Sequence, residues 1–184
     1  MIVTAALTLV MSPPLAILAG VFLSFVNFVQ ASANTVALTR LVRSDDGLFS
    51  EGAPPDGFAS DAVIALRVHG PLFFAGVDNL EHRLSPMLDA RNTTLVLSFR
   101  GYLSVGSTGL LFLERFAHAM HMSGNRLLLA DVSDEIRQEL VRTGVMAKLG
   151  AESVFAAQAD PNASMAEAYA AARAQEMRSN HALL

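Results

Sequence analysis

Apolar and polar positions divide this chain into two unlike parts. The first 39 residues carry no charged side chain, and two apolar runs, residues 2–11 and 15–30, are separated there by Ser-Pro-Pro. Proline ends a helix that begins at residue 2, because it removes a backbone donor and clashes with the preceding turn, but it suits the first turn of a second helix. A membrane-spanning helix needs about 20 apolar residues. The pattern therefore predicts an apolar membrane segment over residues 1–39, with its main span at about residues 14–36.

The flanks of this segment indicate its orientation and leave two alternatives. Arg40 and Arg43 follow it and no basic side chain precedes it, so the positive-inside rule places the rest of the chain in the cytoplasm. Residues 31–33 (Ala-Ser-Ala) match a signal-peptide cleavage site, which would release a secreted domain beginning at Asn34, although no basic region precedes the apolar stretch. The second alternative is a buried hairpin in a soluble protein, for which so long an uncharged run is unusual.

The pattern changes again after the apolar segment. Residues 44–60 contain Asp45, Asp46, three glycines and the pair Pro54-Pro55, and they show no hydrophobic period. Such a composition is typical of a linker. We therefore expect a juxtamembrane linker over residues 40–60, a folded domain over residues 61–174 and a tail over residues 175–184.

Within the expected domain, β-rich runs alternate with helical spacings. A helix over residues 77–88 is predicted by leucines one turn apart, and glycine ends a later helix near residue 122. The predicted strands are residues 62–68, 93–99, 126–132 and a short edge strand at 154–155, and the predicted helices are residues 77–88, 107–122 and 134–142, followed by a last helix. This alternation predicts an α/β domain with a layered sheet and helices packed on it.

Two helix starts carry capping signals. Ser133 is expected to cap the helix over residues 134–142, with Ile136, Leu140 and Val141 facing inward. The sequence Ser164-x-x-Glu167 has the form of a capping box and is expected to open the last helix.

Composition and charge exclude several classes of function. The chain has no cysteine and a net charge of −4, and its arginines form no basic stripe, so we expect no disulfide and no nucleic-acid partner. No phosphate-binding loop, nucleophile elbow or dinucleotide fingerprint is present, so neither an enzyme nor a cofactor site is predicted. Glu114, His118 and His121 have helical spacing that suits a metal, but they lie off the apolar stripe and fit a solvated face, so no metal site is predicted.

Several segments together resemble the STAS domain, which is shared by bacterial anti-sigma-factor antagonists and the C-termini of SulP-type anion transporters. They are residues 68–75 (VHGPLFFA), 95–99, the Gly-Ser-Thr-Gly turn at 106–109, and 126–132 running into 133–144. The run GPLFFA and the ending at residues 150–155 are similar to the transporter form of this domain. The apolar start of the chain is similar to the last membrane helix of SulP transporters.

This resemblance implies a fold and a function. The expected fold is a STAS-like mixed β-sheet flanked by α-helices, preceded by a transmembrane helix or a broken helical hairpin. The expected function is that of the membrane-anchored C-terminal STAS domain of a SulP-type sulfate or anion transporter, regulatory or structural, because one span cannot enclose a transport path. Membrane lipid, the helices of a transport domain and a second copy of the chain are the implied partners. The alternative is a stand-alone STAS module of the antagonist type that binds a kinase or an anti-sigma factor.

The resemblance also indicates a candidate site at Ser107, Thr108 and Gly109. A hydroxyl residue of this loop is phosphorylated in the antagonists, and Ser107 is the favoured match. Ser107 is expected just before a helix N-terminus, where backbone N–H groups accommodate phosphate. The alternative is that Ser107 only caps this helix. The sequence departs from the family at Gly106 and Ser98, two positions where the family commonly has aspartate.

Overall fold

The computed structural model describes residues 13–33, 36–54, 57–70, 72 and 74–181, and the chain divides into two compact units, Met1–Thr35 and Val36–Leu184. The first unit contains helix α2, Pro13–Ala33, which has no acidic residue in its first turn and no basic residue in its last. Its apolar side chains are largely exposed, including Ile17, Phe22 and Phe28. Within the described part of the chain, no helix combines the length and the apolar character that crossing a membrane requires.

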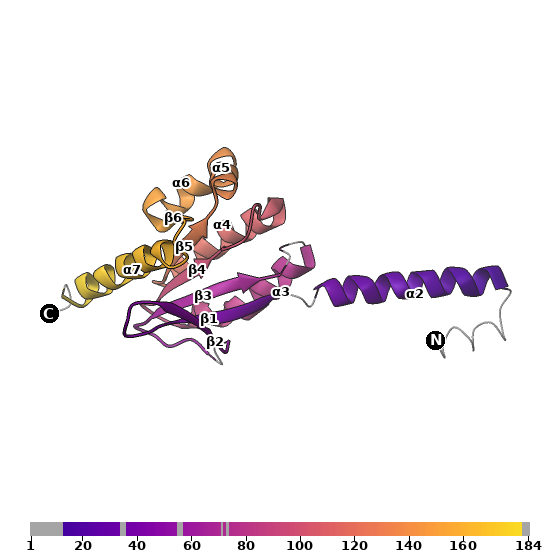
Figure 1. Cartoon of the computed structure of the whole chain (residues 1–184), viewed down its shortest axis with the longest axis horizontal. Coiled ribbons are helices and arrows are strands. Elements are labelled where there is room, and N and C mark those ends of the chain that lie inside the picture. Colours follow the sequence, from indigo (N-terminus) through magenta and orange to yellow (C-terminus); the bar gives the residue numbers. More distant parts are fainter. Residues whose placement is uncertain (1–12, 34–35, 55–56, 71, 73, 182–184) are drawn as a thin grey trace. The chain divides into compact units, whose positions relative to one another are not determined.

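The second unit is built on one six-stranded sheet with the order β2-β1-β3-β4-β5-β6 (Figure 1). The strands are β1 Ala37–Arg43, β2 Phe49–Gly52, β3 Val63–His69, β4 Thr94–Ser98, β5 Arg126–Val132 and β6 Val154–Ala156. Strand β1 is antiparallel to β2 and β3, whereas β3, β4, β5 and β6 run parallel. The carboxyl ends of the parallel strands therefore meet at one edge of the sheet.

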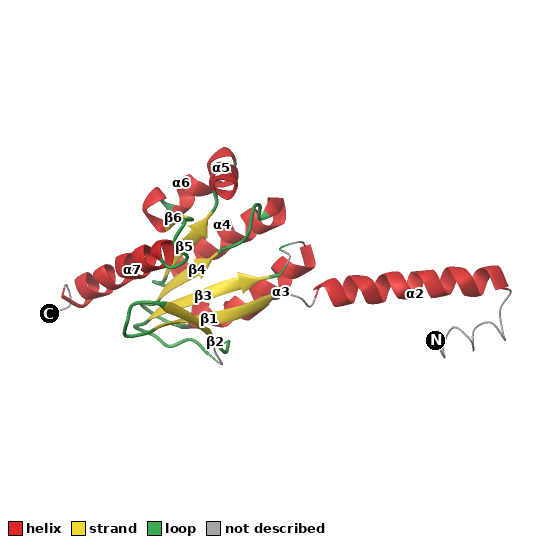
Figure 2. Ribbon diagram, in the orientation of Figure 1, coloured by secondary structure: helices red, strands yellow, loops and turns green. Residues whose placement is uncertain are grey.

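Helices cover both faces of this sheet (Figure 2). They are α3 Phe74–Leu84, α4 Gly106–Met122, α5 Asp134–Arg142, α6 Val145–Leu149 and α7 Ala163–His181, with 3₁₀ turns at Ser85–Asp89 and Ala151–Ser153. Alternate residues of a strand point to opposite faces. Leu66 and Leu97 thus join the larger core with α3, α4 and α5, while Ala65 and Val96 pack in a smaller core that includes residues of α7.

The mixed α/β fold expected from the sequence is confirmed. The linker expected over residues 40–60 is wrong for its first half, because residues 40–52 contain most of β1 and all of β2, which extend the sheet at one edge. Leu38 and Leu41 are 4% exposed and pack into the two different cores. Because β1 points one leucine to each face and its partner β3 lies more than 20 residues away, no local hydrophobic period marks it.

A polar cluster ties β2 to the sheet through Glu51. The Arg67 guanidinium donates to Glu51 Oε1 at 2.6 Å, and His69 Nε2 and the Thr39 hydroxyl each lie 3.2 Å from Glu51 Oε2. Burial by itself would raise the pKa of Glu51, but the hydrogen bond and charge of Arg67, together with His69 and Thr39, lower it below its usual range. These contacts join β1, β2 and β3.

The predicted features of α5 and α3 agree with the structure at the cap of α5 and differ from it at Val141 and at the end of α3. Ser133 caps α5 as predicted, since its hydroxyl accepts from the Ile136 N–H at 3.3 Å. Val141 was expected to face inward, yet it is 61% exposed. The predicted helix over residues 77–88 ends at Leu84 and continues as a 3₁₀ turn with Pro86 near its start, because proline disfavours the helical conformation of the residue before it.

The predicted capping box at the last helix is wrong. Ser164 lies inside α7 and is fully buried, and its hydroxyl accepts from the Asp131 N–H at 2.8 Å and donates to the Phe155 carbonyl at 3.4 Å. Glu167 accepts from the Gln158 amide at 3.0 Å instead of reaching back to the helix start. Ser164 thus links α7 to β5 and β6, a tertiary role that its local sequence does not reveal.

Candidate interaction site at the start of helix α4

The three predicted site residues lie together in the first turn of α4, which follows the loop after β4. Ser107 is exposed, Thr108 is half-buried and Gly109 is buried. A Cβ on Gly109 would lie only 3.2 Å from the Cβ of Val105, so a larger residue would require Val105 to shift by a few tenths of an ångström. Gly106 has a φ of 64°, which L-residues other than glycine rarely adopt. The turn therefore presents the Ser107 hydroxyl to solvent on a tightly packed backbone.

The cap of this helix is supplied by Ser104 and by Glu139 of α5, so the alternative expectation that Ser107 caps it is wrong. The N-cap residue is Val105, whose N–H donates to Glu139 Oε2 at 3.3 Å. The Ser104 hydroxyl donates to Glu139 Oε1 at 2.7 Å and accepts from the Gly106 N–H at 3.1 Å. Sequence reasoning missed Glu139 because it lies 34 residues along the chain from Val105 and 35 from Ser104.

Glu139 changes the electrostatics of the candidate site. The N-terminus of a helix carries a partial positive charge that attracts anions. The Glu139 carboxylate already occupies part of this position, where it holds Ser104 and the Val105 N–H. A phosphate on Ser107 would gain from the helix N-terminus and would be opposed by the carboxylate. The site can therefore accept a negative charge most easily when the Glu139 carboxylate has moved away from the start of α4.

We expect Glu139→Ala to destabilise the protein by about 1–2 kcal/mol, because it removes the cap and leaves the Val105 N–H without an acceptor. Urea unfolding measures the change, and amide hydrogen exchange at Val105 should become faster. Gln138→Ala, an exposed neighbour on α5, is the matched control and should have little effect. Equal effects of the two substitutions would contradict the capping role.

A buried acid lies at the carboxyl ends of β4 and β5, where the loop that leads to α4 begins. Asp131 is 1% exposed, and its Oδ2 accepts from the Ser98 hydroxyl at 2.6 Å. The Arg100 guanidinium donates to Asp131 Oδ1 at 3.3 Å and to the Pro161 carbonyl at 3.2 Å. Ser98 occupies a position where the family was expected to have aspartate. In this chain the carboxylate comes instead from Asp131 on the neighbouring strand β5. The sequence signal that could have revealed this buried acid is the single aspartate, Asp131, inside the apolar run of β5.

Tyr102, in the loop between β4 and α4, connects this loop to the end of β3. Its hydroxyl donates to the Gly70 carbonyl, and its ring meets Phe99 edge-on with centroids 5.9 Å apart. Burial raises the pKa of Tyr102 to about 12 from its usual 10.0. The loops that follow β3 and β4 are therefore joined by a phenol that stays protonated well above neutral pH.

The raised pKa of Tyr102 predicts a loss of stability in alkali. The folded state favours the protonated phenol, so this stabilisation is complete below pH 10.0 and is lost as the pH rises toward about 12. The chain has two tyrosines, so a Tyr169→Phe variant isolates Tyr102 in an absorbance titration of tyrosinate. We expect a midpoint near 12 in the folded protein. A midpoint at the ordinary value would show that the phenol is solvated.

Glu114, His118 and His121, the three residues with metal-ligand spacing, all lie on α4 and do not form a cluster. The Glu114 carboxylate pairs with the Lys148 ammonium of α6, while His118 and His121 are exposed. Among the residues that the structure describes, no group of three side chains is placed to hold a metal ion.

Comparison with known proteins identifies the family. The STAS domain family model matches residues 59–159, which is more than half of the chain. The chain therefore belongs to the STAS domain family. No curated protein sequence matches it significantly.

Solved structures show the same architecture. A sulfate transporter family protein from Wolinella succinogenes is similar with a TM-score of 0.53 and 24% identity, over 74% of this chain and 97% of that chain. The murine Solute Carrier 26 family member A9 anion transporter, in its inward-facing state, gives a TM-score of 0.64 at 15% identity over 94% of this chain. A second structure of SLC26A9 gives 0.65 at 15% identity over 98% of this chain. This chain spans only 28% and 30% of those two transporters.

Proposed function

We propose that this chain is the STAS domain of a SulP-type anion permease and has a regulatory or structural role beside the transport domain. The observation that carries the proposal is the structural likeness to SLC26A9, an anion transporter, which extends over 94% of this chain and so includes more than the matched STAS region. The sulfate transporter family protein from Wolinella succinogenes has the same fold. The chain acts by contact with other protein surfaces and not as an enzyme or as a transporter by itself.

The proposed role gives helix α2 a function as the membrane-associated part of the chain. Its exposed side chains are predominantly apolar, for example Leu18, Phe25 and Val29, and contact with water is unfavourable for so much apolar surface. Lipid and the helices of a transport domain are the partners that would cover it. Arg40 and Arg43, which follow α2 in the sequence, favour a cytoplasmic position for the second unit.

Membrane fractionation tests this part of the proposal. We expect the full chain to stay with membranes after a high-salt wash and alkaline extraction. A double variant with aspartate at Phe22 and Phe25 should move to the soluble fraction, because each charge in hydrocarbon costs about 2.5–3.5 kcal/mol. A matched variant with aspartate at two exposed positions of the second unit, Leu103 and Val141, should remain with membranes. Recovery of the unaltered chain in the soluble fraction would contradict membrane association.

A domain exchange tests the transporter role. The second unit, Val36–Leu184, would replace the STAS domain of a SulP-type permease whose uptake depends on that domain. We expect the chimera to regain anion uptake and membrane abundance above the permease that lacks a STAS domain. Normal abundance without uptake would leave only a structural role, and loss of both would overturn the proposal.

A second candidate function is partner binding through Ser107, Thr108 and Gly109, as in a stand-alone antagonist-type STAS module. The observation that favours it is the exposed Ser107 hydroxyl in the first turn of α4. Mass spectrometry of the chain isolated from growing cells would detect phosphate on Ser107, and Ser107→Ala provides the control. Phosphate on Ser107 would favour this function, and its absence under all growth conditions would exclude regulated phosphorylation.

Self-association is a further part of the proposal. Exposed apolar side chains on the second unit, such as Leu111 and Met122 of α4, offer surface for contact with a second copy. Analytical ultracentrifugation of the chain in detergent would show a dimer, and a monomer at all concentrations would exclude it.

A further inference from the structure

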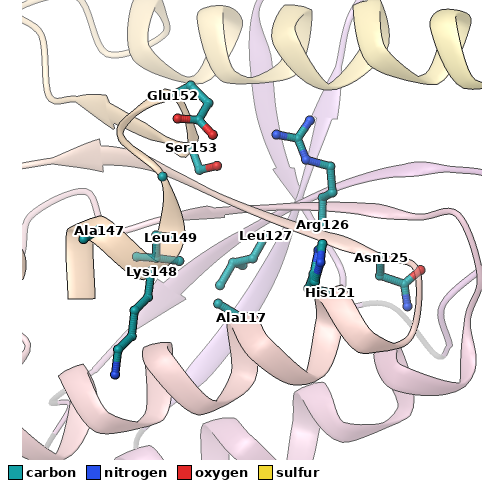
Figure 3. A pocket seen from close by; sticks show the side chains of 11 residues that line it. Ala117, His121, Asn125, Arg126, Leu127, Ala147, Lys148, Leu149, Glu152 and Ser153 are labelled. Atoms are coloured by element: carbon teal, nitrogen blue, oxygen red, sulfur yellow. The ribbon is translucent and has the colours of Figure 1, made fainter. Parts of the chain in front are cut away.

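A polar pocket lies at the opposite end of α4 from the candidate site, where α4 ends and β5 begins. Its volume is about 420 Å³, within the range of small-molecule sites. Ala117, Leu127, Ala147 and Leu149 form its apolar wall. Arg126, Glu152 and Ser153 contribute the polar groups (Figure 3). The pocket thus combines an apolar surface with both a positive and a negative side chain.

The two opposite charges lie in one pocket without neutralising one another. Among the described residues, neither Arg126 nor Glu152 takes part in an ion pair or a side-chain hydrogen bond. In Figure 3 the Arg126 guanidinium and the Glu152 carboxylate lie toward the same end of the pocket, with Ser153 beside Glu152. A bound molecule can therefore present a negative group to Arg126 and a positive group to Glu152 within the same pocket.

Three neighbouring polar side chains already have partners, whereas His121 of α4, which also lines the pocket, is exposed. The Lys148 ammonium pairs with Glu114 and points away from Arg126 and Glu152 in Figure 3. Glu176 of α7, which lines a smaller hollow beside Arg126, pairs with Arg173 at 3.0 Å. The Asn125 amide donates to the Met87 and Ala90 carbonyls and accepts from the Thr93 N–H. Among the arginine, lysine and carboxylate side chains that line the pocket, Arg126 and Glu152 are therefore the two without an ion-pair partner in the described part of the chain.

The backbone adds further hydrogen-bonding capacity. Strand β6 pairs with β5 first at Leu129, so the start of β5, from Arg126 to Leu128, has no neighbouring strand on that side. The Arg126 N–H is directed to β4, where it donates to the Thr93 carbonyl. The backbone N–H and C=O groups of successive residues point to opposite sides of a strand. Those of Leu127 therefore point away from β4, toward the pocket. An open strand edge offers a donor and an acceptor to a bound molecule.

From these observations we infer that the pocket binds a small zwitterion of the amino-acid class with an apolar side chain. The carboxylate of the ligand pairs with Arg126 and its ammonium pairs with Glu152, while the side chain lies against Leu127 and Leu149. Ionised partners form the stronger hydrogen bonds, so both charges contribute to affinity and to the choice of ligand. This site lies apart from Ser107 and does not depend on the proposed transporter role.

Three matched probes test the inference with the full chain in detergent micelles. L-leucine carries both charges, 4-methylpentanoate lacks the ammonium, and L-leucinamide lacks the carboxylate. Two-dimensional amide NMR should show shifts at Leu127 and Gly150 on addition of leucine, with a dissociation constant on the order of 1 mM. Each single-charge probe should bind at least about tenfold more weakly, because one charged hydrogen bond is lost.

Variants locate the binding. Arg126→Gln and Glu152→Gln should each weaken leucine binding by at least about tenfold, whereas Arg142→Gln on exposed α5 should leave it unchanged. Ala147→Phe, an exposed lining position, should block the pocket without a change of charge. The dispersion of the amide spectrum verifies that each variant is folded. Equal binding of 4-methylpentanoate or leucinamide, unaltered binding by the variants, or no shifts with leucine would each overturn the inference.

Discussion

Replacement of Asp131 by alanine will lower the free energy of unfolding by about 3–5 kcal/mol. The Asp131 carboxylate accepts from the fully buried Ser98 hydroxyl at 2.6 Å and from Arg100 at 3.3 Å. Its loss leaves the Ser98 hydroxyl without its acceptor, whereas Arg100, which is 32% exposed, can turn to water. Alanine at residue 131 is also strained, since the backbone there has a φ of 56°.

Asparagine at position 131 is the matched control. Asn tolerates this backbone conformation and keeps an oxygen acceptor for Ser98, so Asp131→Asn should cost only about 1–2 kcal/mol. Urea unfolding followed by circular dichroism gives both values. Ser98→Ala should cost about 1 kcal/mol and should make the Asp131 substitutions less damaging in a double-mutant cycle. Additive effects of Ser98 and Asp131 would contradict the pairing.

The second large effect concerns the boundary of the folded domain. A fragment that begins at Val36 should fold, whereas one that begins at Asp61, the boundary expected from the sequence, should be unfolded or aggregated. The shorter fragment lacks β1 and β2, which removes the buried side chains of Val36, Leu38 and Leu41 and exposes the edge of β3. Each such side chain contributes about 1.5–3 kcal/mol by burial, and a domain has only about 5–15 kcal/mol in total.

Amide NMR and thermal unfolding of the two fragments measure this difference. An internal comparison uses Leu38→Asp and Val42→Asp in the longer fragment, because Leu38 is buried and Val42 is 48% exposed in the same strand. We expect the first substitution to abolish cooperative unfolding and the second to preserve it. A cooperative transition in the fragment that begins at Asp61 would show that β1 and β2 are dispensable.

Segments with strong local patterns were predicted well. Strand β5 has the predicted bounds, α4 begins within one residue of the predicted position and Ser133 caps α5. In each case a run of apolar residues, a helical spacing or a capping side chain lies within the element itself. The resemblance to STAS domains rested on these same segments, and the family match confirms it.

The candidate site was only half predicted. Its position at the start of α4 followed from the turn Gly-Ser-Thr-Gly after a strand, and the exposed Ser107 agrees with that position. The Glu139 carboxylate that holds Ser104 was not predicted, because its contacts join residues more than 30 positions apart. The pocket that contains Arg126 and Glu152 likewise combines residues of two segments that show no shared motif.

Helices and strands whose own side chains specify the period could be predicted from the amino-acid sequence, and so could the family. Three features required the folded chain: β1 and β2 complete the sheet, Asp131 supplies the acid beside Ser98, and Ser164 links α7 to β5 instead of capping a helix. The physical reason is the same in each case. Hydrophobic period and caps act within a few residues, whereas strand pairing and buried hydrogen bonds depend on which distant segments the fold brings together.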